Sequence, residues 1–329
     1  MSAALCRIAP GETEATSLGD TLSYLKYVVD DPEVEQAKIH SKPVQSDDGY
    51  IYFTSMDERG EKPDGSTLPI WGSHLWRLDP MAEEVYWEHV RAFPDALIAT
   101  NCTGKFVYAL GYFGHVLYQY DTETGSIRSN TVGSVGGHIS RNFLVDLNQN
   151  AYVPRITPTG SSFKVELVQL DPELNELGVF PLTDYDVTAD FRSHGIVSYA
   201  ALKNGDLVFV TAKGALYRVV TASGQPSSLE RLGWIHPEGE SYSAFLVCPD
   251  GEQVLCSLSR AKQAKQFQWL TYDLQENSQT ATDLDLPPDS PLLDALAYGC
   301  NTIDDDGNAF IVGQHNWDPF VLRVSWSQE

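Results

Sequence analysis

Six tight hairpin turns recur along the chain about every fifty residues, a spacing that few architectures share. The turns are Asp48-Gly49, Thr103-Gly104, Asn148-Gln149, Asn204-Gly205, Asp250-Gly251 and Asp306-Gly307. Each turn separates two short apolar runs, as in ALKNGDLVFV, and a third apolar run such as LWRLDP follows. Repeated units of four short strands are typical of the blades of a β-propeller. The sequence therefore predicts an all-β fold of this kind.

The repeat predicts a single β-propeller domain over residues 1–329, with seven blades. Six complete units begin near Lys38, Pro94, Gly137, Ser193, Glu240 and Asp294. The N-terminal segment LCRIAPGETEATSLGD has the pattern of an outer pair of strands. We therefore expect residues 1–19 to supply outer strands of a closing blade and residues 20–37 to form a connector. The inner strands of that blade are not visible, so either the chain is truncated upstream or a ring of six blades closes with an N-terminal strand.

The chain is acidic, with a formal net charge of -23 at pH 7. Binding to phosphates needs a basic surface, so we expect no nucleic-acid partner. The sequence contains no run of about eighteen apolar residues, so we expect no membrane span. The N-terminal segment MSAALCRIAPGETEATSLG lacks the charged start and apolar core of a signal peptide. We expect a monomer.

The histidines are distributed unevenly over the predicted blades. Connections that enter the first strand of a blade share one face with connections from its second to its third strand. Seven of the eight histidines fall in these connections: His40, His138, His194 and His236 in the first kind, and His74, His115 and His315 in the second. His89 lies in a predicted outer strand. The asymmetry predicts a ligand site on one face, although long loops also collect polar residues that bind nothing.

Arginines and tyrosines occur close to these histidines. Arg141 follows His138 in GGHISRNF, Arg155 lies in NAYVPRITP, and the segment TDYDVTADFRSHG carries Tyr185, Arg192 and His194. The segment GESYSAF adds Tyr242. In a chain with 22 Lys plus Arg, three arginines near one rim indicate an anionic ligand. The alternative for Arg155 is a pair with a surface carboxylate.

This combination of residue types suits proton abstraction next to a carboxylate. In a polysaccharide that contains uronic acid, an arginine or a protonated histidine neutralises the carboxylate and makes the C5 proton more acidic. A histidine or tyrosine takes that proton, and an imidazole or phenol donates one to the leaving glycosidic oxygen. The predicted partner is therefore an acidic polysaccharide or oligosaccharide.

The succession GYFGHVLYQYD, GGHISRNF, TDYDVT and GESYSAF resembles that of the β-propeller polysaccharide lyases that act on ulvan and related uronate polymers. The resemblance implies that His115 and His138 are the catalytic histidine pair, with Tyr185 or Tyr242 as the phenol. It implies Arg192 or Arg155 as the group that neutralises the carboxylate. We predict Arg155, Arg192, His194, Arg141 and His40 as substrate-binding residues. An extracellular polymer also implies a secreted or periplasmic protein.

Two alternatives stay open at this point. The chain also resembles, more distantly, the oligogalacturonate lyases, which hold a divalent cation in a histidine cluster; His40, His138 and His194 are the candidates here, although no cofactor is expected. The second alternative is a non-catalytic propeller that binds a ligand or a protein, as a sensor or scaffold, because this fold alone does not imply catalysis.

Overall fold

The computed structural model describes residues 3–9, 11–29, 33–57, 59, 70–133, 142–185, 195–261, 264, 266–287, 290, 292, 295–298, 302–316 and 318–325. Two compact units make up the chain. The first comprises Met1–Ala151, Arg155–Pro158 and Leu170–Asn175, and the second comprises Tyr152–Pro154, Thr159–Gln169 and Glu176–Glu329.

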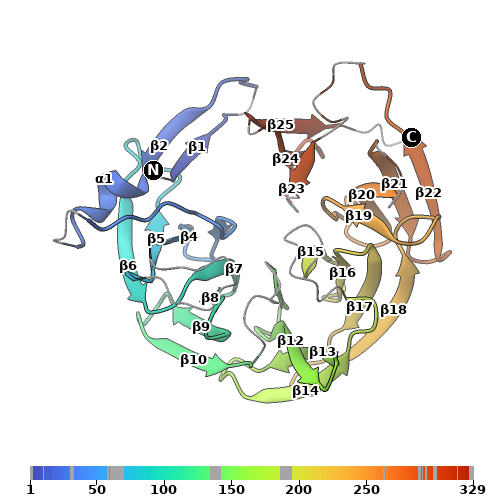
Figure 1. Ribbon diagram of the computed structural model, residues 1–329, viewed down its shortest axis with the longest axis horizontal. Helices are drawn as coiled ribbons and strands as arrows, with labels where there is room; N and C mark the ends of the chain where they lie inside the picture. Colours follow the sequence, from blue (N-terminus) through green and yellow to red (C-terminus); the bar gives the residue numbers. More distant parts are fainter. Residues whose placement is uncertain are drawn as a thin grey trace. The chain divides into compact units, whose positions relative to one another are not determined.

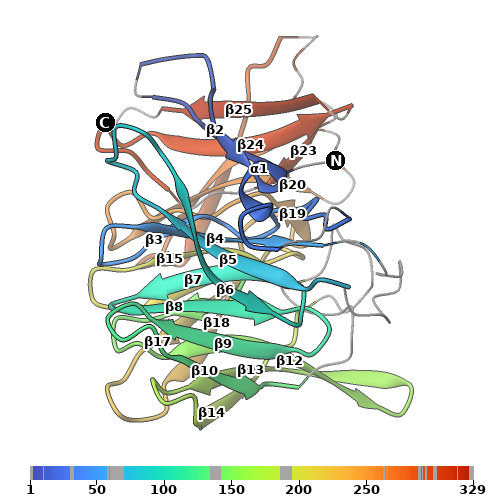
Figure 2. The ribbon, with the colours of Figure 1, turned by 90° about the vertical axis from the view of Figure 1, so that its left-hand side faces the viewer.

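The first unit holds a hairpin, a short helix and two four-stranded antiparallel sheets. The hairpin pairs β1 (Ala4–Arg7) with β2 (Thr16–Asp20), and α1 (Thr21–Leu25) follows. The first large sheet contains β3 (Val44–Gln45), β4 (Ile51–Met56), β5 (Ser73–Leu78) and β6 (Trp87–Phe93). The second contains β7 (Leu97–Thr103), β8 (Phe106–Gly111), β9 (Val116–Asp121) and β10 (Ile127–Thr131). Figure 2 shows these two sheets stacked face to face.

In the second large sheet of the first unit, burial decreases from β8 to the outermost strand β10. All six residues of β8, FVYALG, are buried, as expected for a short apolar run between turns. The outer strand β10, IRSNT, is polar and mostly exposed, which protects the sheet edge from pairing with another chain. Between the two sheets, Tyr52 and Leu75 pack against Leu97 and Val107. The hydrophobic effect thus holds neighbouring sheets together across their faces.

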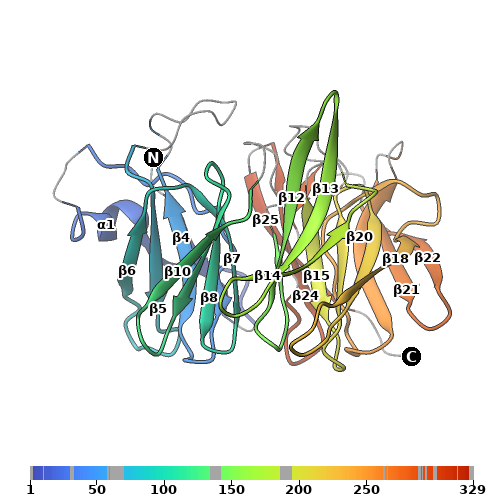
Figure 3. The same cartoon turned by 90° about the horizontal axis from the view of Figure 1, so that it is seen from below.

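A second apolar cluster joins the N-terminal segments to the first large sheet. Leu25 of α1 packs with Phe53, Trp76 and Trp87. The Trp87 indole N–H donates to the Leu18 carbonyl at 2.9 Å, which ties the N-terminal hairpin to β6. Helix α1 consequently lies against the outer side of β6 (Figure 1, Figure 3).

A third four-stranded sheet contributes residues to both units. It consists of β11 (Leu144–Val145), β12 (Ala151–Thr159), β13 (Ser162–Leu170) and β14 (Glu176–Pro181), in that order. On the side of the first unit, the Asn101 amide donates to the Phe143 carbonyl at 2.9 Å. The Thr103 hydroxyl donates to the Asp146 carbonyl at 2.8 Å. These side-chain bonds link the inner strand β7 to the start of the next repeat.

The second unit contains three further sheets. The first is β15 (Ile196–Ala201), β16 (Leu207–Thr211), β17 (Ala215–Val220) and β18 (Ser228–Trp234). The next is β19 (Ser241–Ser243), β20 (Val254–Ala261), β21 (Gln268–Asp273) and β22 (Ser278–Asp283). The last has three strands, β23 (Leu296–Tyr298), β24 (Ala309–His315) and β25 (Asp318–Val324). Apolar clusters fill the spaces between successive sheets, with Leu246 and Leu270 in one and Phe245 and Ile311 in the other.

All six predicted turns contain a residue in the left-handed backbone region. Five of these residues are glycines, among them Gly49 with φ 86° and Gly205 with φ 91°, and the sixth is Gln149 with φ 66°. The tight turn between antiparallel strands requires this conformation, which explains the recurring glycine. The predicted all-β fold with repeated four-stranded sheets is confirmed. The number of blades, and the assignment of residues 1–19 to a closing blade, stay predictions.

No helix in the described part of the chain has the length and apolarity that crossing a bilayer requires.

Candidate functional site

A buried carboxylate organises the loop between β8 and β9. Asp95 is 3% exposed, and its carboxylate accepts hydrogen bonds from the backbone N–H groups of Phe113, at 3.0 Å, and Gly114, at 2.9 Å. A Cβ atom on Gly111 would lie 2.2 Å from Asp95 Oδ2, and one on Gly114 would lie 2.8 Å from it. Glycine at both positions therefore lets the carboxylate approach the loop. Burial raises the pKa of Asp95, and the backbone N–H groups oppose that shift.

His115 ends this loop in an unusual conformation. Its φ of 49° lies in the left-handed region, which few residues other than glycine and asparagine adopt without cost. The side chain is 2% exposed, and its ring nitrogens make no hydrogen bond of standard geometry within the described ranges, although the Gly133 backbone lies close enough to interact with the ring. The His115 carbonyl accepts a hydrogen bond from the Val132 N–H at 3.0 Å. Backbone strain of this kind clusters at functional sites, so position 115 is a candidate for one.

The surroundings of His115 keep its imidazole neutral. Burial is the main cause that lowers its pKa from 6.5 to about 4. The backbone of Gly133 opposes the shift, and the positive charge of Arg155 adds to it. At neutral pH the ring therefore has one unprotonated nitrogen and is able to accept a proton.

Arg155 is the predicted residue whose positive charge acts on His115. It lies on β12 and is half-buried. His40, another predicted binding residue of the first unit, is exposed and precedes β3. Of the predicted site residues, one histidine, His115, and one arginine, Arg155, therefore interact electrostatically.

The two predicted tyrosines belong to the second unit. Tyr242 lies on β19, and its hydroxyl donates to the Ala297 carbonyl at 2.9 Å. Tyr185 is buried and directly follows Asp184, whose backbone N–H donates to the Tyr217 hydroxyl at 3.2 Å. The phenol of Tyr242 thus connects two sheets, a structural role that the sequence did not reveal.

The remaining predicted site residues lie outside the described part of the chain: His138, Arg141, Arg192 and His194. Two of the three candidate metal ligands, His138 and His194, are among them. Within the described ranges, His, Cys, Asp and Glu side chains form no group of three that could hold a metal ion.

Two further histidines contact each other in the first unit, the buried His74 and the half-buried His89. Nδ1 of His74 lies 3.1 Å from Nε2 of His89, so one ring donates a hydrogen bond to the other. Burial, together with the charge of His89, lowers the pKa of His74 to about 4. Burial also lowers the pKa of His89. The pair therefore stays neutral at pH 7.

His236, in the second unit, has a structural role. Its Nε2 lies 2.7 Å from the Gln268 amide oxygen, and its Nδ1 accepts a hydrogen bond from the Glu238 N–H. Both ring nitrogens of His236 thus have hydrogen-bond partners within its own unit. A histidine on the predicted histidine-rich face is therefore not necessarily a functional residue.

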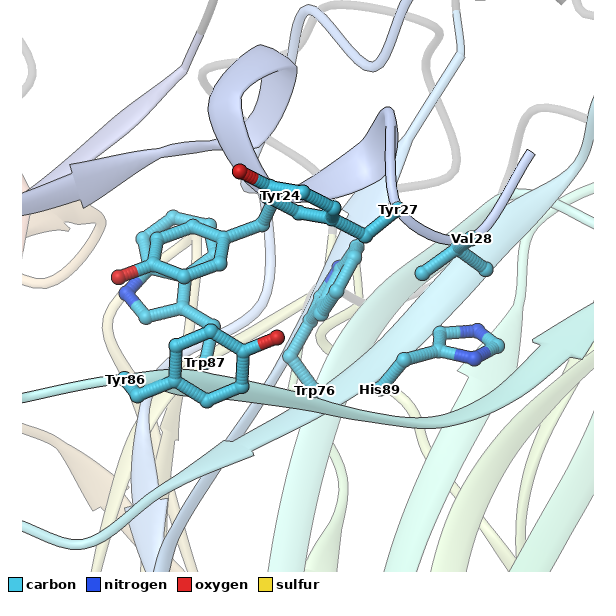
Figure 4. Close-up of a pocket in the computed structure, with 7 residues that line it drawn as sticks. All are labelled: Tyr24, Tyr27, Val28, Trp76, Tyr86, Trp87 and His89. Atoms are coloured by element: carbon cyan, nitrogen blue, oxygen red, sulfur yellow. The ribbon is translucent and has the colours of Figure 1, made fainter. Parts of the chain in front are cut away.

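An aromatic pocket lies beside the histidine pair, between the helix region and the first large sheet. Its volume is about 360 Å³, and its walls come from α1, the residues after it, β5, β6 and the turn before β6. The lining residues are Tyr24, Tyr27, Val28, Trp76, Tyr86, Trp87 and His89. Tyr24 stacks on the Trp87 indole with 4.8 Å between ring centroids (Figure 4). The sequence signal for this pocket is a pair of aromatic segments, SYLKY and VYWEH, which the distribution of histidines over the blades did not indicate.

Comparison with known proteins defines the class of fold. No protein-family model matches the chain, and no curated protein matches its sequence significantly. A candidate 6-phosphogluconolactonase from Bacteroides uniformis has a similar structure, with a TM-score of 0.51 and 12% identity over 86% of this chain and 79% of the other. Together with the repeated antiparallel sheets, this similarity shows that the chain has a β-propeller fold.

Two other solved structures are also similar to this chain. An oligogalacturonate lyase in complex with manganese has a TM-score of 0.47 and 10% identity over 86% of this chain and 76% of the other. TolB from Acinetobacter baumannii has a TM-score of 0.42 and 13% identity over 84% of this chain, which spans 64% of the TolB chain. At these identities the similarity concerns the fold, and function has to be argued from the site.

Proposed function

We propose that this protein cleaves a uronate-containing polysaccharide by β-elimination, at a site that includes His115 and Arg155. The observation that carries this proposal is the environment of His115. A buried, neutral imidazole beside the Gly133 backbone is held in a left-handed conformation, and the positive charge of Arg155 acts on it. A neutral base under the influence of a positive charge is the combination that proton abstraction beside a carboxylate requires.

In the proposed reaction, Arg155 pairs with the uronate carboxylate and stabilises the charge that develops when the C5 proton leaves. The neutral ring of His115 accepts that proton. The C4–O bond then breaks, a C4=C5 double bond forms, and the leaving oxygen takes a proton from an acid. A carboxylate bound at Arg155 would offset the positive charge that lowers the pKa of His115, which makes the ring a stronger base once substrate is present.

The other predicted residues complete the proposal. His138 is proposed as the second histidine of the pair, and Tyr185 or Tyr242 as the phenol that protonates the leaving oxygen. In the free protein the Tyr242 hydroxyl donates to the Ala297 carbonyl. The proposed substrate contacts beyond Arg155 are His40, Arg141, Arg192 and His194.

One observation favours a second function, non-catalytic ligand binding. His115 is 2% exposed, and a polymer needs access to the base that deprotonates it. In this second view His115 is a structural residue and the propeller recognises its ligand without cleaving it.

Ultraviolet absorbance of unsaturated uronate distinguishes the two functions. The protein is mixed with ulvan, pectate, alginate and a glycosaminoglycan, each with and without a chelator. Elimination predicts rising absorbance with at least one polymer, and the chelator arm tests the metal alternative. No rise with any of the four polymers would contradict the lyase proposal and favour binding.

A further inference from the structure

The aromatic pocket of the first unit has the features of a second ligand site, separate from the loop that holds His115. It is lined by five aromatic side chains and a histidine, and its volume of about 360 Å³ falls at the lower end of the range for small-molecule sites. Tyr27 is 71% exposed and Tyr86 is 60% exposed, although large aromatic side chains usually avoid water.

Some hydrogen-bonding groups of the pocket already make hydrogen bonds within the described part of the protein, and two hydroxyls do not. The indole N–H groups donate to neighbours, Trp76 to the Ser55 hydroxyl at 2.8 Å and Trp87 to a backbone carbonyl. The Tyr24 hydroxyl donates to the Val85 carbonyl at 3.3 Å. The hydroxyls of Tyr27 and Tyr86 make no hydrogen bond within the described residues. Figure 4 shows the Tyr86 hydroxyl pointing into the space beside Trp76.

The charges around the pocket select against charged ligands. No Asp or Glu is among the lining residues, so the wall offers a cation aromatic faces but no carboxylate. The Lys26 ammonium already lies 4.9 Å from the centroid of the Tyr27 ring, where it would repel a second cation. Anions are disfavoured by the negative faces of the aromatic rings and by the net charge of -23. The pocket therefore suits a neutral ligand.

We propose that this pocket binds a neutral pyranose ring of an oligosaccharide. A pyranose presents an apolar face of C–H groups, which packs on an aromatic ring, and hydroxyls at its edge, which exchange hydrogen bonds with phenols. The pocket offers both kinds of surface in a space that accepts a sugar ring. This site differs from the proposed uronate site in its residues and in the charge of its ligand, and it does not depend on elimination taking place.

Isothermal titration calorimetry of the whole 329-residue chain tests the proposal. The neutral probes are cellotetraose, laminaritetraose and mannotetraose, and the charged probes are trigalacturonate and tetramethylammonium. We expect one neutral probe to bind, and we expect Tyr86→Ala and Tyr27→Ala each to weaken it about tenfold, because each removes one aromatic contact. Met81→Ala is the matched control, since Met81 is 88% exposed and outside the pocket lining.

Several results would overturn this inference. They are the absence of binding by all three neutral probes, affinity unchanged in both tyrosine variants, and preferential binding of tetramethylammonium. Binding that persists in Tyr86→Ala and is lost in His115→Asn would assign the saccharide to the other site and also overturn the inference. Because the tyrosines are exposed, we expect both variants to keep the wild-type circular dichroism spectrum, and Tyr86→Phe separates loss of the hydroxyl from loss of the ring.

Discussion

The charge of Arg155 acts on His115 without any substrate, so their interaction can be measured in the free protein. We expect Arg155→Gln to raise the pKa of His115, because the variant removes a positive charge that disfavours the imidazolium. Burial is the larger cause, so the pKa should stay below its usual value of 6.5. NMR titration of the histidine ring protons gives the pKa directly. Arg128→Gln is the control, and an unchanged His115 pKa in Arg155→Gln would contradict the predicted coupling.

His115 and Arg155 could be predicted as site residues from the sequence, because histidine is a common acid–base group and arginine a common anion-binding group. The role of Asp95 could not, because the carboxylate acts on backbone N–H groups 18 and 19 residues away. The aromatic pocket was hidden for a similar reason, since Tyr24 and the Val85 carbonyl that it contacts are 61 residues apart. The sequence predicted Tyr242 as a possible catalytic phenol. It could not show that the Tyr242 hydroxyl donates a hydrogen bond to the next sheet.

The loop from Gly111 to His115 depends on space that one methyl group would fill. We expect Gly111→Ala to lower the free energy of unfolding by about 2–4 kcal/mol, because its Cβ would lie 2.2 Å from the Asp95 carboxylate. Gly125→Ala is the matched control in the same sheet. Gly125 has open space around it and a φ of 70°, so alanine there costs only backbone strain of about 1 kcal/mol. Urea denaturation measures both, and an equal loss in the two variants would contradict the steric role of Gly111.

The strands and turns were the most predictable elements. Their signal is local, because a tight turn needs a left-handed residue and the flanking strands need apolar side chains. Gln149 departs from the glycine pattern at φ 66°, yet its turn still forms, with a hydrogen bond from its N–H to the Asp146 carbonyl at 3.0 Å. Sheet order followed from the short connections between consecutive strands, whereas loop conformations such as that of His115 depended on contacts with distant residues.

Two buried histidines make the stability of the whole protein depend on pH. His74 and His115 have a pKa of about 4 in the folded protein and about 6.5 when unfolded. The unfolded chain therefore binds protons first as the pH falls, so the free energy of unfolding declines between about pH 6.5 and 4 and is unaffected by these groups above that range. Each contributes on the order of 2–3 kcal/mol to the decline. Asp95 has a raised pKa, so its effect has the opposite sign and offsets part of the change.

Urea denaturation at several pH values between 7.5 and 4.5 tests this dependence. We expect His74→Asn to flatten the decline, whereas His40→Asn, at an exposed position, should leave it unchanged. His74→Asn should also lower stability at neutral pH, because it breaks the hydrogen bond with His89. A decline as steep in His74→Asn as in the wild type would show that another group controls the acid sensitivity.

For the molecule as a whole, the most direct measurement compares the wild type with His115→Asn on the same polyuronate. Asparagine tolerates the left-handed backbone of position 115, so the fold should persist while the imidazole is lost. We predict that the wild type forms unsaturated uronate and that His115→Asn forms it at least about a hundredfold more slowly, as expected when a general base is removed. Equal rates in the two proteins would contradict the assignment of His115 as the base.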